Sequence, residues 1–403
     1  MELPPDFLAE LGFIPGGEVH VEVSVEGIGL SRPLGSLGKI YIEPTNQCNL
    51  SCRTCIRNAW EGVPTGFMDL GVFQRAVQGI SRLPNPPLVF FGGYGEPLLH
   101  PEILQMVRSA KEAGSRVELI TNGTLLDEAM SLGLARAGLD RLWVSLDGAT
   151  SEGYGSLRPA TPLNVVIENL YRFNQLATGP RPFVLPRPAL GVVFVATRRN
   201  LHELPQVVFL ASRLGATEFL VTNVLPHTME MAKEGLFGCG LHEAAFEPSI
   251  FRLHLPRMDS WELANPGLIS VLRSGFSLSL AGAELCKAHN RCPFVEEGSF
   301  VIGWQGEASP CLPLLYTHTQ YLNEFERKCL RHVLGNVEEK GLMELWLDEA
   351  HILFRKRVKE FAFSPCTACG GCDLLESNQE DCFGNPHPTC GGCLFAQGVV
   401  RCP

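Results

Sequence analysis

Short apolar segments and amphipathic segments alternate through the first half of the chain. The amphipathic segments carry apolar residues three or four positions apart, as in a helix with one buried face; they cover roughly 70–80, 102–113, 127–137, 164–176 and 201–214. The apolar segments have the length of buried strands; they are Lys39–Glu43, Leu88–Phe91, Arg116–Thr121, Arg141–Leu146, Leu190–Ala196 and Glu218–Val224. Strands that alternate with helices predict parallel βα units, whose functional site lies at the carboxyl ends of the strands.

Outside this region the pattern changes. Residues 19–26 alternate between apolar and polar, which predicts a small N-terminal β-hairpin. Residues 340–361 predict one more helix, and the segment from Cys366 onward is dense in Cys, Gly and Pro without periodicity. We therefore expect four parts: a hairpin extension over 1–37, a βα core over 38–225, a bridging region over 226–283 and a Cys-rich domain over 284–403.

Composition places the chain among globular proteins. It has 403 residues, 45% of them hydrophobic and 19% charged. With 33 Lys and Arg against 43 Asp and Glu, the net charge of -10 leaves no broad basic surface for nucleic acid. We find no apolar run of membrane-spanning length and no signal peptide, so we expect no membrane partner and a cytoplasmic location.

The fifteen cysteines are distributed unevenly. Three lie at positions 48–55, one is Cys239, and the other eleven lie between Cys286 and Cys402. A chain without an export signal is expected to keep its thiols reduced, and a chain with a large core does not need disulfides for stability. The cysteines therefore predict metal binding near both ends of the chain.

The first cluster directly follows the first strand of the βα series. Cys48, Cys52 and Cys55 have the spacing C-x3-C-x2-C. Three thiolates on one loop can bind three irons of a cubane and leave the fourth iron open for a ligand. The alternative is a zinc loop with a distant fourth ligand.

This triad and its surroundings resemble the radical SAM superfamily over about residues 39–225. The resemblance implies a partial (β/α)6 barrel of the TIM type, within the α/β class. It also implies a 4Fe-4S cluster whose open iron binds S-adenosylmethionine (SAM), and reductive cleavage of SAM to a 5′-deoxyadenosyl radical. One position departs from the family pattern, because Thr54 stands where an aromatic residue is usual.

Loops after the next three strands match the family's SAM-binding segments. The sequence FFGGYGEP resembles the glycine-rich motif for the methionyl amino group, and Glu96 can accept hydrogen bonds from a cationic amine. ITNGT and VSLDG follow the two later strands. The resemblance thus implies eight cofactor-binding residues: Gly92, Gly93, Gly95, Glu96, Thr121, Asn122, Ser145 and Asp147.

The second cysteine region resembles the SPASM domain, which binds auxiliary clusters. Gly306 stands five residues before Cys311, a Gly-Asn turn follows at Gly335, and a helix leads to a C-x2-C pair. The resemblance implies that Cys286, Cys292 and Cys311 bind one auxiliary cluster and that Cys366 and Cys369 begin a second. The remaining candidate ligands are Cys372, Cys382, Cys390, Cys393 and Cys402. Two 4Fe-4S clusters need eight thiolates, and ten are present from Cys286 onward if Cys329 is set aside, so two of those ten are spare. Zinc knuckles are the alternative.

The tail from residue 378 narrows the resemblance to radical SAM maturases of tungsten cofactor oxidoreductases. That group implies a peptide, protein or tungstopterin substrate and a reducing partner such as ferredoxin or flavodoxin. A peptide modifier that forms thioethers or matures sulfatases is the alternative enzyme. A non-catalytic electron-transfer protein is the alternative of another class, but an open iron has no purpose in such a protein.

Overall fold

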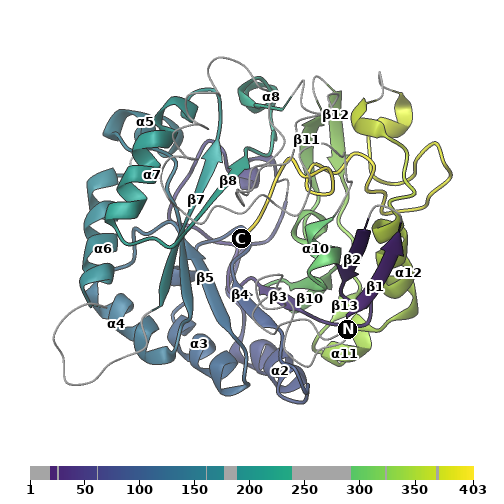
Figure 1. Cartoon of the computed structure of the whole chain (residues 1–403), viewed down its shortest axis with the longest axis horizontal. Coiled ribbons are helices and arrows are strands. Elements are labelled where there is room, and N and C mark those ends of the chain that lie inside the picture. The colour runs from purple at the N-terminus through teal and green to yellow at the C-terminus, as the bar shows by residue number, and fades with distance from the viewer. Residues whose placement is uncertain are drawn as a thin grey trace.

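A nine-stranded sheet forms the centre of the molecule (Figure 1), with the strand order β13-β10-β9-β3-β4-β5-β6-β7-β8. The computed structural model describes residues 19–24, 27–60, 62–159, 161–176, 188–237, 292–322, 325–368 and 372–403. The six predicted strands are parallel neighbours in this sheet: β3 Lys39–Ile42, β4 Leu88–Phe91, β5 Val117–Thr121, β6 Arg141–Ser145, β7 Ala189–Ala196 and β8 Glu218–Asn223.

Helices connect these strands and cover the outer face of the sheet. They are α2 Leu70–Ile80, α3 Ile103–Glu112, α4 Glu128–Ala137, α5 Ser151–Leu157, α6 Leu163–Leu176 and α7 Leu204–Arg213. A further helix, α8 Met229–Glu234, follows β8. The side chain of Asp69 accepts a hydrogen bond from Gly71 N and so caps α2. Gly114 follows α3 with a φ of +89°.

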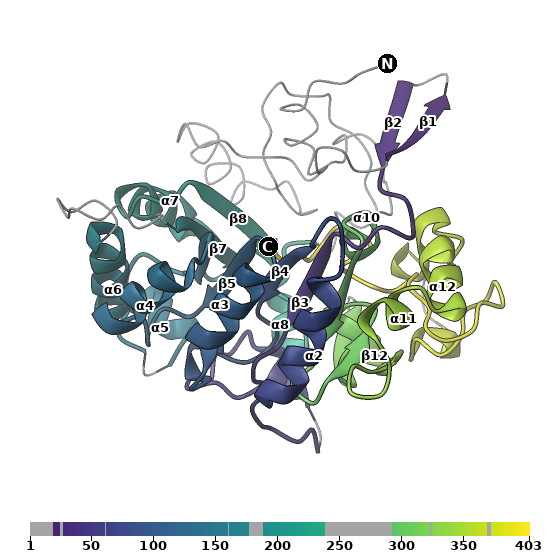
Figure 2. The same cartoon turned by 90° about the horizontal axis from the view of Figure 1, so that it is seen from below.

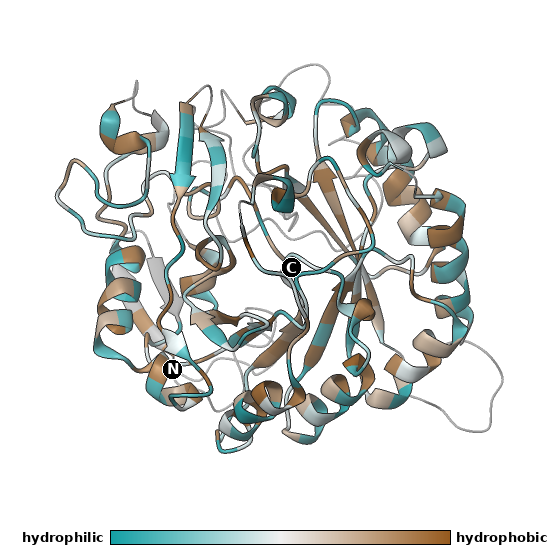
Figure 3. Ribbon diagram, turned by 180° about the vertical axis from the view of Figure 1, so that it is seen from behind, coloured by the Kyte–Doolittle hydropathy of each residue, from teal (hydrophilic) through white to brown (hydrophobic). Residues whose placement is uncertain are grey.

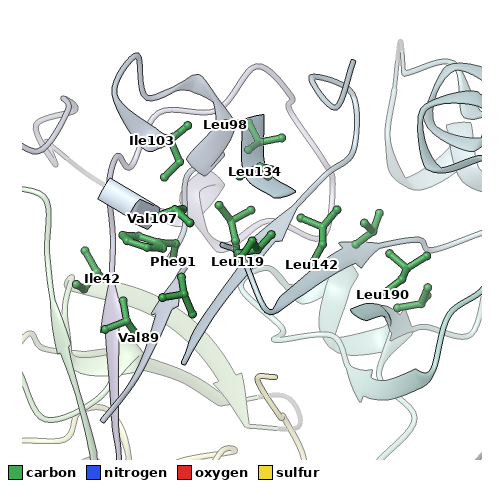
Figure 4. Packing of buried hydrophobic residues seen from close by; sticks show 14 of the residues in the cluster. Ile42, Val89, Phe91, Leu98, Ile103, Val107, Leu119, Leu134, Leu142 and Leu190 are labelled. Carbon is green, nitrogen blue, oxygen red and sulfur yellow. The ribbon is translucent and has the colours of Figure 1, made fainter. Parts of the chain in front are cut away.

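The two faces of the sheet form two separate cores because strand residues alternate in direction. Ile42, Val89 and Phe91 face the helices and belong to a layer of apolar side chains that Figure 4 shows. Tyr41, Phe90 and Trp143 face inward and pack against the C-terminal part of the chain. The apolar sides of the helices accordingly turn toward the sheet (Figure 3).

The C-terminal part extends the same sheet. Strand β9 (Ser299–Ile302) pairs in parallel with β3, so the sheet continues past the first predicted strand. The remaining elements are α10 Pro293–Glu296, β10 Glu307–Ser309, β11 His318–Leu322, β12 Phe325–Cys329, β13 Gly335–Asn336, α11 Leu342–Trp346 and α12 Glu349–Glu360. Strands β11 and β12 form a separate hairpin.

The single helix predicted over 340–361 is wrong, because two helices occupy this segment. The side chain of Asp348 accepts a hydrogen bond from His351 N at 3.3 Å and starts α12 anew. The predicted N-terminal hairpin is present as β1 (His20–Ser24) and β2 (Gly27–Ser31), and it lies on the same side of the molecule as α12 (Figure 2).

The predicted fold class is therefore confirmed: parallel βα units, an N-terminal hairpin and a Cys-rich C-terminal region. The predicted bridging region covers residues 226–283. Its residues from 238 to 283 lie outside the described residues. Among the described residues, no helix has both the length and the apolarity needed to cross a bilayer.

Candidate active site

Two buried polar residues anchor the loop that carries the first three cysteines. This loop follows β3. The amide of Asn46 donates to Pro64 O at 2.9 Å and accepts from Gly66 N at 3.0 Å, and the hydroxyl of Thr45 donates to Gly66 O. Both side chains are shielded from solvent. The base of the cysteine loop is thereby fixed at the carboxyl end of the first core strand.

Arg57 holds the cysteine loop closed around its thiols. Its guanidinium donates to Cys55 Sγ at 3.4 Å, to Leu50 O at 2.8 Å and to Asn46 O at 3.5 Å. The backbone N–H of Leu50 donates to Cys48 Sγ at 3.4 Å. Both contacts to sulfur favour a thiolate, which is the form that binds iron.

The same thiols are partly buried, and burial acts against the thiolate. Burial raises the pKa of Cys48, and it raises that of Cys52 to about 11. Although burial alone would lower the pKa of Arg57, the thiols of Cys55, Cys48 and Cys52 raise it. Iron binding at this loop must therefore displace protons, and two cations lie near the resulting negative charge: Arg57 beside Cys48 and Cys55, and Arg158 near Cys52.

The glycine-rich loop after β4 packs directly against the cysteine loop. A Cβ on Gly95 would lie 2.1 Å from Thr45 O, and one on Gly93, whose φ is +137°, would lie 2.7 Å from the Glu43 side chain. Only glycine permits this approach. Glu96 N also donates to Gln47 O at 2.8 Å, so the two predicted motifs form one structure.

Glu96 joins the ends of β4 and β5. Its carboxylate accepts hydrogen bonds from the Thr121 hydroxyl at 2.8 Å, from Asn122 N at 2.7 Å and from Leu98 N at 3.0 Å. Burial raises its pKa, although these three donors oppose the shift. Oε2 accepts only one of the three bonds, which leaves it room to accept from a bound amine.

Asn122 extends the same network to the cysteines. Its side-chain N–H lies 2.9 Å from Asn49 Oδ1 and 3.8 Å from Cys48 Sγ. The side-chain oxygen Oδ1 of Asn122 accepts a hydrogen bond from the hydroxyl of Thr124 at 2.6 Å. That hydroxyl oxygen in turn accepts one from Asn49 Nδ2 at 2.8 Å. The structure thus brings the cysteine triad, the glycine motif and the Thr121–Asn122 loop together at the ends of β3, β4 and β5.

Ser145 and Asp147 are joined by a residue that sequence reasoning missed. Arg158 donates to Asp147 Oδ2 at 2.9 and 2.7 Å and to Ser145 Oγ at 2.6 Å. Asp147 Oδ1 accepts from Val195 N at 2.9 Å, and its side chain is 1% exposed. In this structure Asp147 braces β6 against β7 and α5, and its predicted contact with SAM stays a prediction.

Glu43 was also missed, since a single Glu at a strand end carries no distinctive signal. One carboxylate oxygen accepts from Tyr94 N at 2.9 Å and the other from the hydroxyl of Tyr316. The ring of Trp60 packs against both tyrosines, at centroid distances of 5.4 and 4.6 Å. Tyr94 donates to Leu312 O at 2.8 Å, next to Cys311, so this group connects the two cysteine regions.

Five further cysteines line one cavity in the C-terminal region. Cys292, Cys311, Cys390 and Cys393 line it together with Cys329. Burial is the main reason why the pKa of Cys311 lies well above its usual value, and the nearby thiols of Cys292, Cys393 and Cys390 raise it further. The predicted ligands Cys292 and Cys311 therefore lie beside two cysteines from the tail.

This donor set suits a cluster better than a single zinc ion. In the part of the chain that the structure describes, no three Cys, His, Asp or Glu side chains converge closely enough to hold one ion. The thiols of Cys292, Cys311, Cys390 and Cys393 line one cavity together with that of Cys329, and in an iron-sulfur cubane each of four thiolates binds a different iron.

The other predicted ligands lie elsewhere. Cys366 is half-buried, while Cys372 and Cys382 are exposed. Ser364 N donates to Asp381 Oδ2 at 3.0 Å, which ties the segment of Cys366 to that of Cys382. Cys402 is absent from the cavity lining. Cys286 and Cys369 lie outside the described residues.

Cys402 belongs to a tail segment that crosses the inner face of the sheet. Arg401 N donates to Thr222 Oγ1 at 2.8 Å, while Lys39 Nζ and the Tyr41 hydroxyl donate to Pro403 O at 2.7 and 2.9 Å. The chain end accordingly lies near the middle of the view in Figure 1. Burial raises the pKa of Cys402 to about 12, and Lys39 opposes the shift.

Comparison with known families agrees with this geometry. The radical SAM superfamily matches residues 42–179, and the SPASM iron-sulfur cluster-binding domain matches residues 292–373. The chain belongs to the radical SAM superfamily and carries a C-terminal SPASM domain. It is an enzyme of SAM-dependent radical chemistry, whose core binds a 4Fe-4S cluster and SAM and whose SPASM region binds iron-sulfur.

Within that superfamily the chain is similar to the tungsten-containing aldehyde ferredoxin oxidoreductase cofactor-modifying protein of Pyrococcus furiosus. The two are 31% identical over 90% of this chain and 96% of the relative. The mycofactocin maturase MftC of Mycobacterium tuberculosis is 24% identical over 90% of this chain and 79% of its own length.

Solved structures support the fold. One is Streptococcus suis SuiB bound to its precursor peptide SuiA, with a TM-score of 0.57 and 17% identity. The similarity covers 88% of this chain and 72% of the SuiB chain. Another is the anSMEcpe protein with bound AdoMet, with a TM-score of 0.52 and 17% identity. The similarity covers 84% of this chain and 88% of the anSMEcpe chain.

Proposed function

We propose that the protein is a maturase whose 5′-deoxyadenosyl radical modifies a target needed by a tungsten-dependent aldehyde oxidoreductase. When bound, the core cluster and SAM supply that radical. The observation that carries the proposal is the packing of the three-cysteine loop against Glu96 and Asn122. Similarity to the tungsten cofactor-modifying protein over nearly its whole length supports the choice of target.

Each residue of the site has a specific part in this proposal. Cys48, Cys52 and Cys55 hold the core cluster, and Arg57 stabilises their negative charge. Glu96 accepts from the methionyl amine through the free capacity of Oε2. The Trp60, Tyr94 and Tyr316 rings close the side of the site toward the SPASM region and exclude water there.

The cavity of the SPASM region is proposed to hold an auxiliary 4Fe-4S cluster on Cys292, Cys311, Cys390 and Cys393. The second auxiliary cluster is then assigned to the remaining closely spaced cysteines: Cys366, Cys369, Cys372 and Cys382. Under this assignment Cys286, Cys329 and Cys402 are not cluster ligands. A ferredoxin or flavodoxin would supply the electron that starts turnover.

A peptide-modifying role is the second candidate. It is favoured by the similarity to MftC along 90% of this chain, because that relative is named as a maturase of mycofactocin. The electron-transfer alternative is set aside, since the chain belongs to a family of enzymes.

The experiment is anaerobic incubation of the reconstituted protein with dithionite, SAM and each candidate target. We expect 5′-deoxyadenosine to form, to increase with the tungsten oxidoreductase or its pterin cofactor, and to be accompanied by a mass change of that target. The Cys52→Ala variant is the matched control and should form none. Stimulation by a short Cys-rich peptide alone would favour the second candidate.

Iron content tests the cluster assignments. We expect about twelve irons in wild type and a loss of about four in each of Cys48→Ala, Cys292→Ala and Cys390→Ala. Cys286→Ala should retain all of them. Full iron in Cys390→Ala and loss in Cys286→Ala would reject the proposed ligand set.

A further inference from the structure

One wall of the cysteine cavity carries a buried cation. Arg327 lies on β12, where exposed Glu326 and Lys328 alternate with the inward-facing Arg327 and Cys329. The alternation of a strand places an apolar residue at such an inward position in an ordinary hairpin. Here the inward residue is an arginine that is 1% exposed and lines the cavity.

The guanidinium is held firmly but has no acidic partner among the residues that the structure describes. It donates to Leu375 O at 2.6 Å and to Thr389 Oγ1 at 3.5 Å, and its Cζ would lie 3.0 Å from a Cβ on Gly392. Within the described ranges, no carboxylate lies at ion-pair distance from it. A buried charge without a counter-charge is strongly destabilising, so the site needs an anion.

The neighbouring thiols identify where that anion lies. Arg327 lines the same cavity as Cys329, Cys390 and Cys393. Its Cζ and Nε would each lie 3.0 Å from a Cβ on Gly392, the residue next to Cys393. Arg327 therefore lies at the wall of the cavity that carries two of the cysteines we assign as cluster ligands. A 4Fe-4S cluster on four thiolates is anionic, and one-electron reduction makes it more negative.

We propose that Arg327 is the counter-cation of the auxiliary cluster in this cavity and raises its reduction potential. The proposal rests on the cluster assignment made above. The cluster gains one electron on reduction while Arg327 keeps its proton, so the cation stabilises the reduced form more than the oxidised form. A higher potential suits a cluster that accepts an electron from a substrate radical.

The test is an anaerobic redox titration followed by electron paramagnetic resonance, in a Cys48→Ala background that lacks the core cluster. Removing the charge in Arg327→Met should lower the equilibrium constant for reduction about tenfold, which is about 59 mV for a one-electron couple. Arg327→Lys should keep most of the wild-type potential. Arg355 is equally buried but stacks on Trp346 outside the cavity, so Arg355→Met should leave the potential unchanged.

A second variant decides the question if Arg327→Met does not assemble its cluster. Gln320 lines the cavity and is the direct cross-strand partner of Arg327. Gln320→Glu should neutralise Arg327 and lower the potential similarly. An unchanged potential in whichever variant retains iron would overturn the proposal. Failure of the cluster assignment is visible separately, because Cys390→Ala would then keep its iron and its signal.

Discussion

At the scale of single residues, Glu43 is a buried carboxyl of the candidate active site whose pKa is strongly shifted. It is fully buried, and burial raises its pKa from 4.5 to about 7, although the hydrogen bonds from Tyr316 and from Tyr94 N oppose the shift. The protonation of Glu43 therefore changes near neutral pH, where most carboxyl groups are already ionised.

This shift predicts a pH-dependent stability. The unfolded chain releases the Glu43 proton near pH 4.5, whereas the folded chain keeps it until about pH 7. The stabilisation from the protonated form is complete below pH 4.5 and is lost as pH rises through 7. It amounts to about 3 kcal/mol. We expect anaerobic urea unfolding to show that Glu43→Gln gains stability relative to wild type over this range.

Tyr316→Phe is the matched variant for this prediction. It removes a bond that lowers the pKa of Glu43, so the loss of stability should extend to higher pH. A constant stability difference between wild type and Glu43→Gln from pH 5 to pH 8 would contradict the assigned shift.

Arg158 gives a second prediction at the same scale. Its ion pair with Asp147 is buried, with side-chain exposures of 6% and 1%. Removing one partner leaves the other charge buried and unpaired, so Arg158→Met should lose about 3–5 kcal/mol of unfolding free energy. The control is Arg172→Met, whose pair with Glu168 is exposed; it should change by no more than about 0.5 kcal/mol. Equal losses in both variants would show that burial of the pair is unimportant.

At the scale of elements, the core strands were predictable because each is short, apolar and bounded by turns. The predicted bounds of β4 are the observed ones, and those of β3, β5, β6, β7 and β8 differ by one residue at one end. Helix α5 escaped prediction because it contains two glycines. It forms because Glu203 accepts from Ala149 N, Thr150 N and the Thr150 hydroxyl, which fixes its N-terminus.

The candidate site was predictable to the extent that its residues are close in sequence. The spacing of Cys48, Cys52 and Cys55 carries its own signal, and the structure places the glycine motif beside it. The grouping of Cys311 with Cys390 is different, because it depends on how the tail folds back over the β11–β12 hairpin (Figure 1). No local pattern encodes such a contact.

The junction of the cysteine loop and the glycine loop gives a prediction about these two elements. A Cβ at Gly95 would lie 2.1 Å from Thr45 O and 2.6 Å from Gln47 O, both backbone atoms that cannot move independently. Gly95→Ala should separate the loops and abolish the spectroscopic response of the core cluster to SAM. The auxiliary iron, about eight per chain, should remain.

Gly155→Ala serves as the control for Gly95→Ala. Gly155 lies in α5, and a Cβ there would meet nothing within 4 Å. Alanine in a helix is more favourable than glycine, so this variant should gain up to about 1 kcal/mol and respond to SAM normally. A normal response in Gly95→Ala would mean that the two loops need not touch.

At the scale of the whole molecule, the radical SAM and SPASM segments share one sheet. Strand β9 pairs with β3 at four positions, and Glu43 N donates to Ile302 O at 2.9 Å beyond them. Tyr41 contacts Phe294 at a centroid distance of 5.7 Å and donates to Pro403 O. The inner face of the core sheet is therefore covered by the SPASM region and the tail.

This arrangement predicts that the core will not fold alone. A fragment of residues 38–237 would expose the β3 edge and the inward-facing Tyr41, Phe90 and Trp143 to water. An unpaired apolar strand edge favours association between chains. We expect size-exclusion chromatography to find this fragment aggregated under conditions in which the full chain is not. A monomeric fragment whose urea midpoint equals that of the full chain would instead show that the shared sheet adds nothing to the stability of the core.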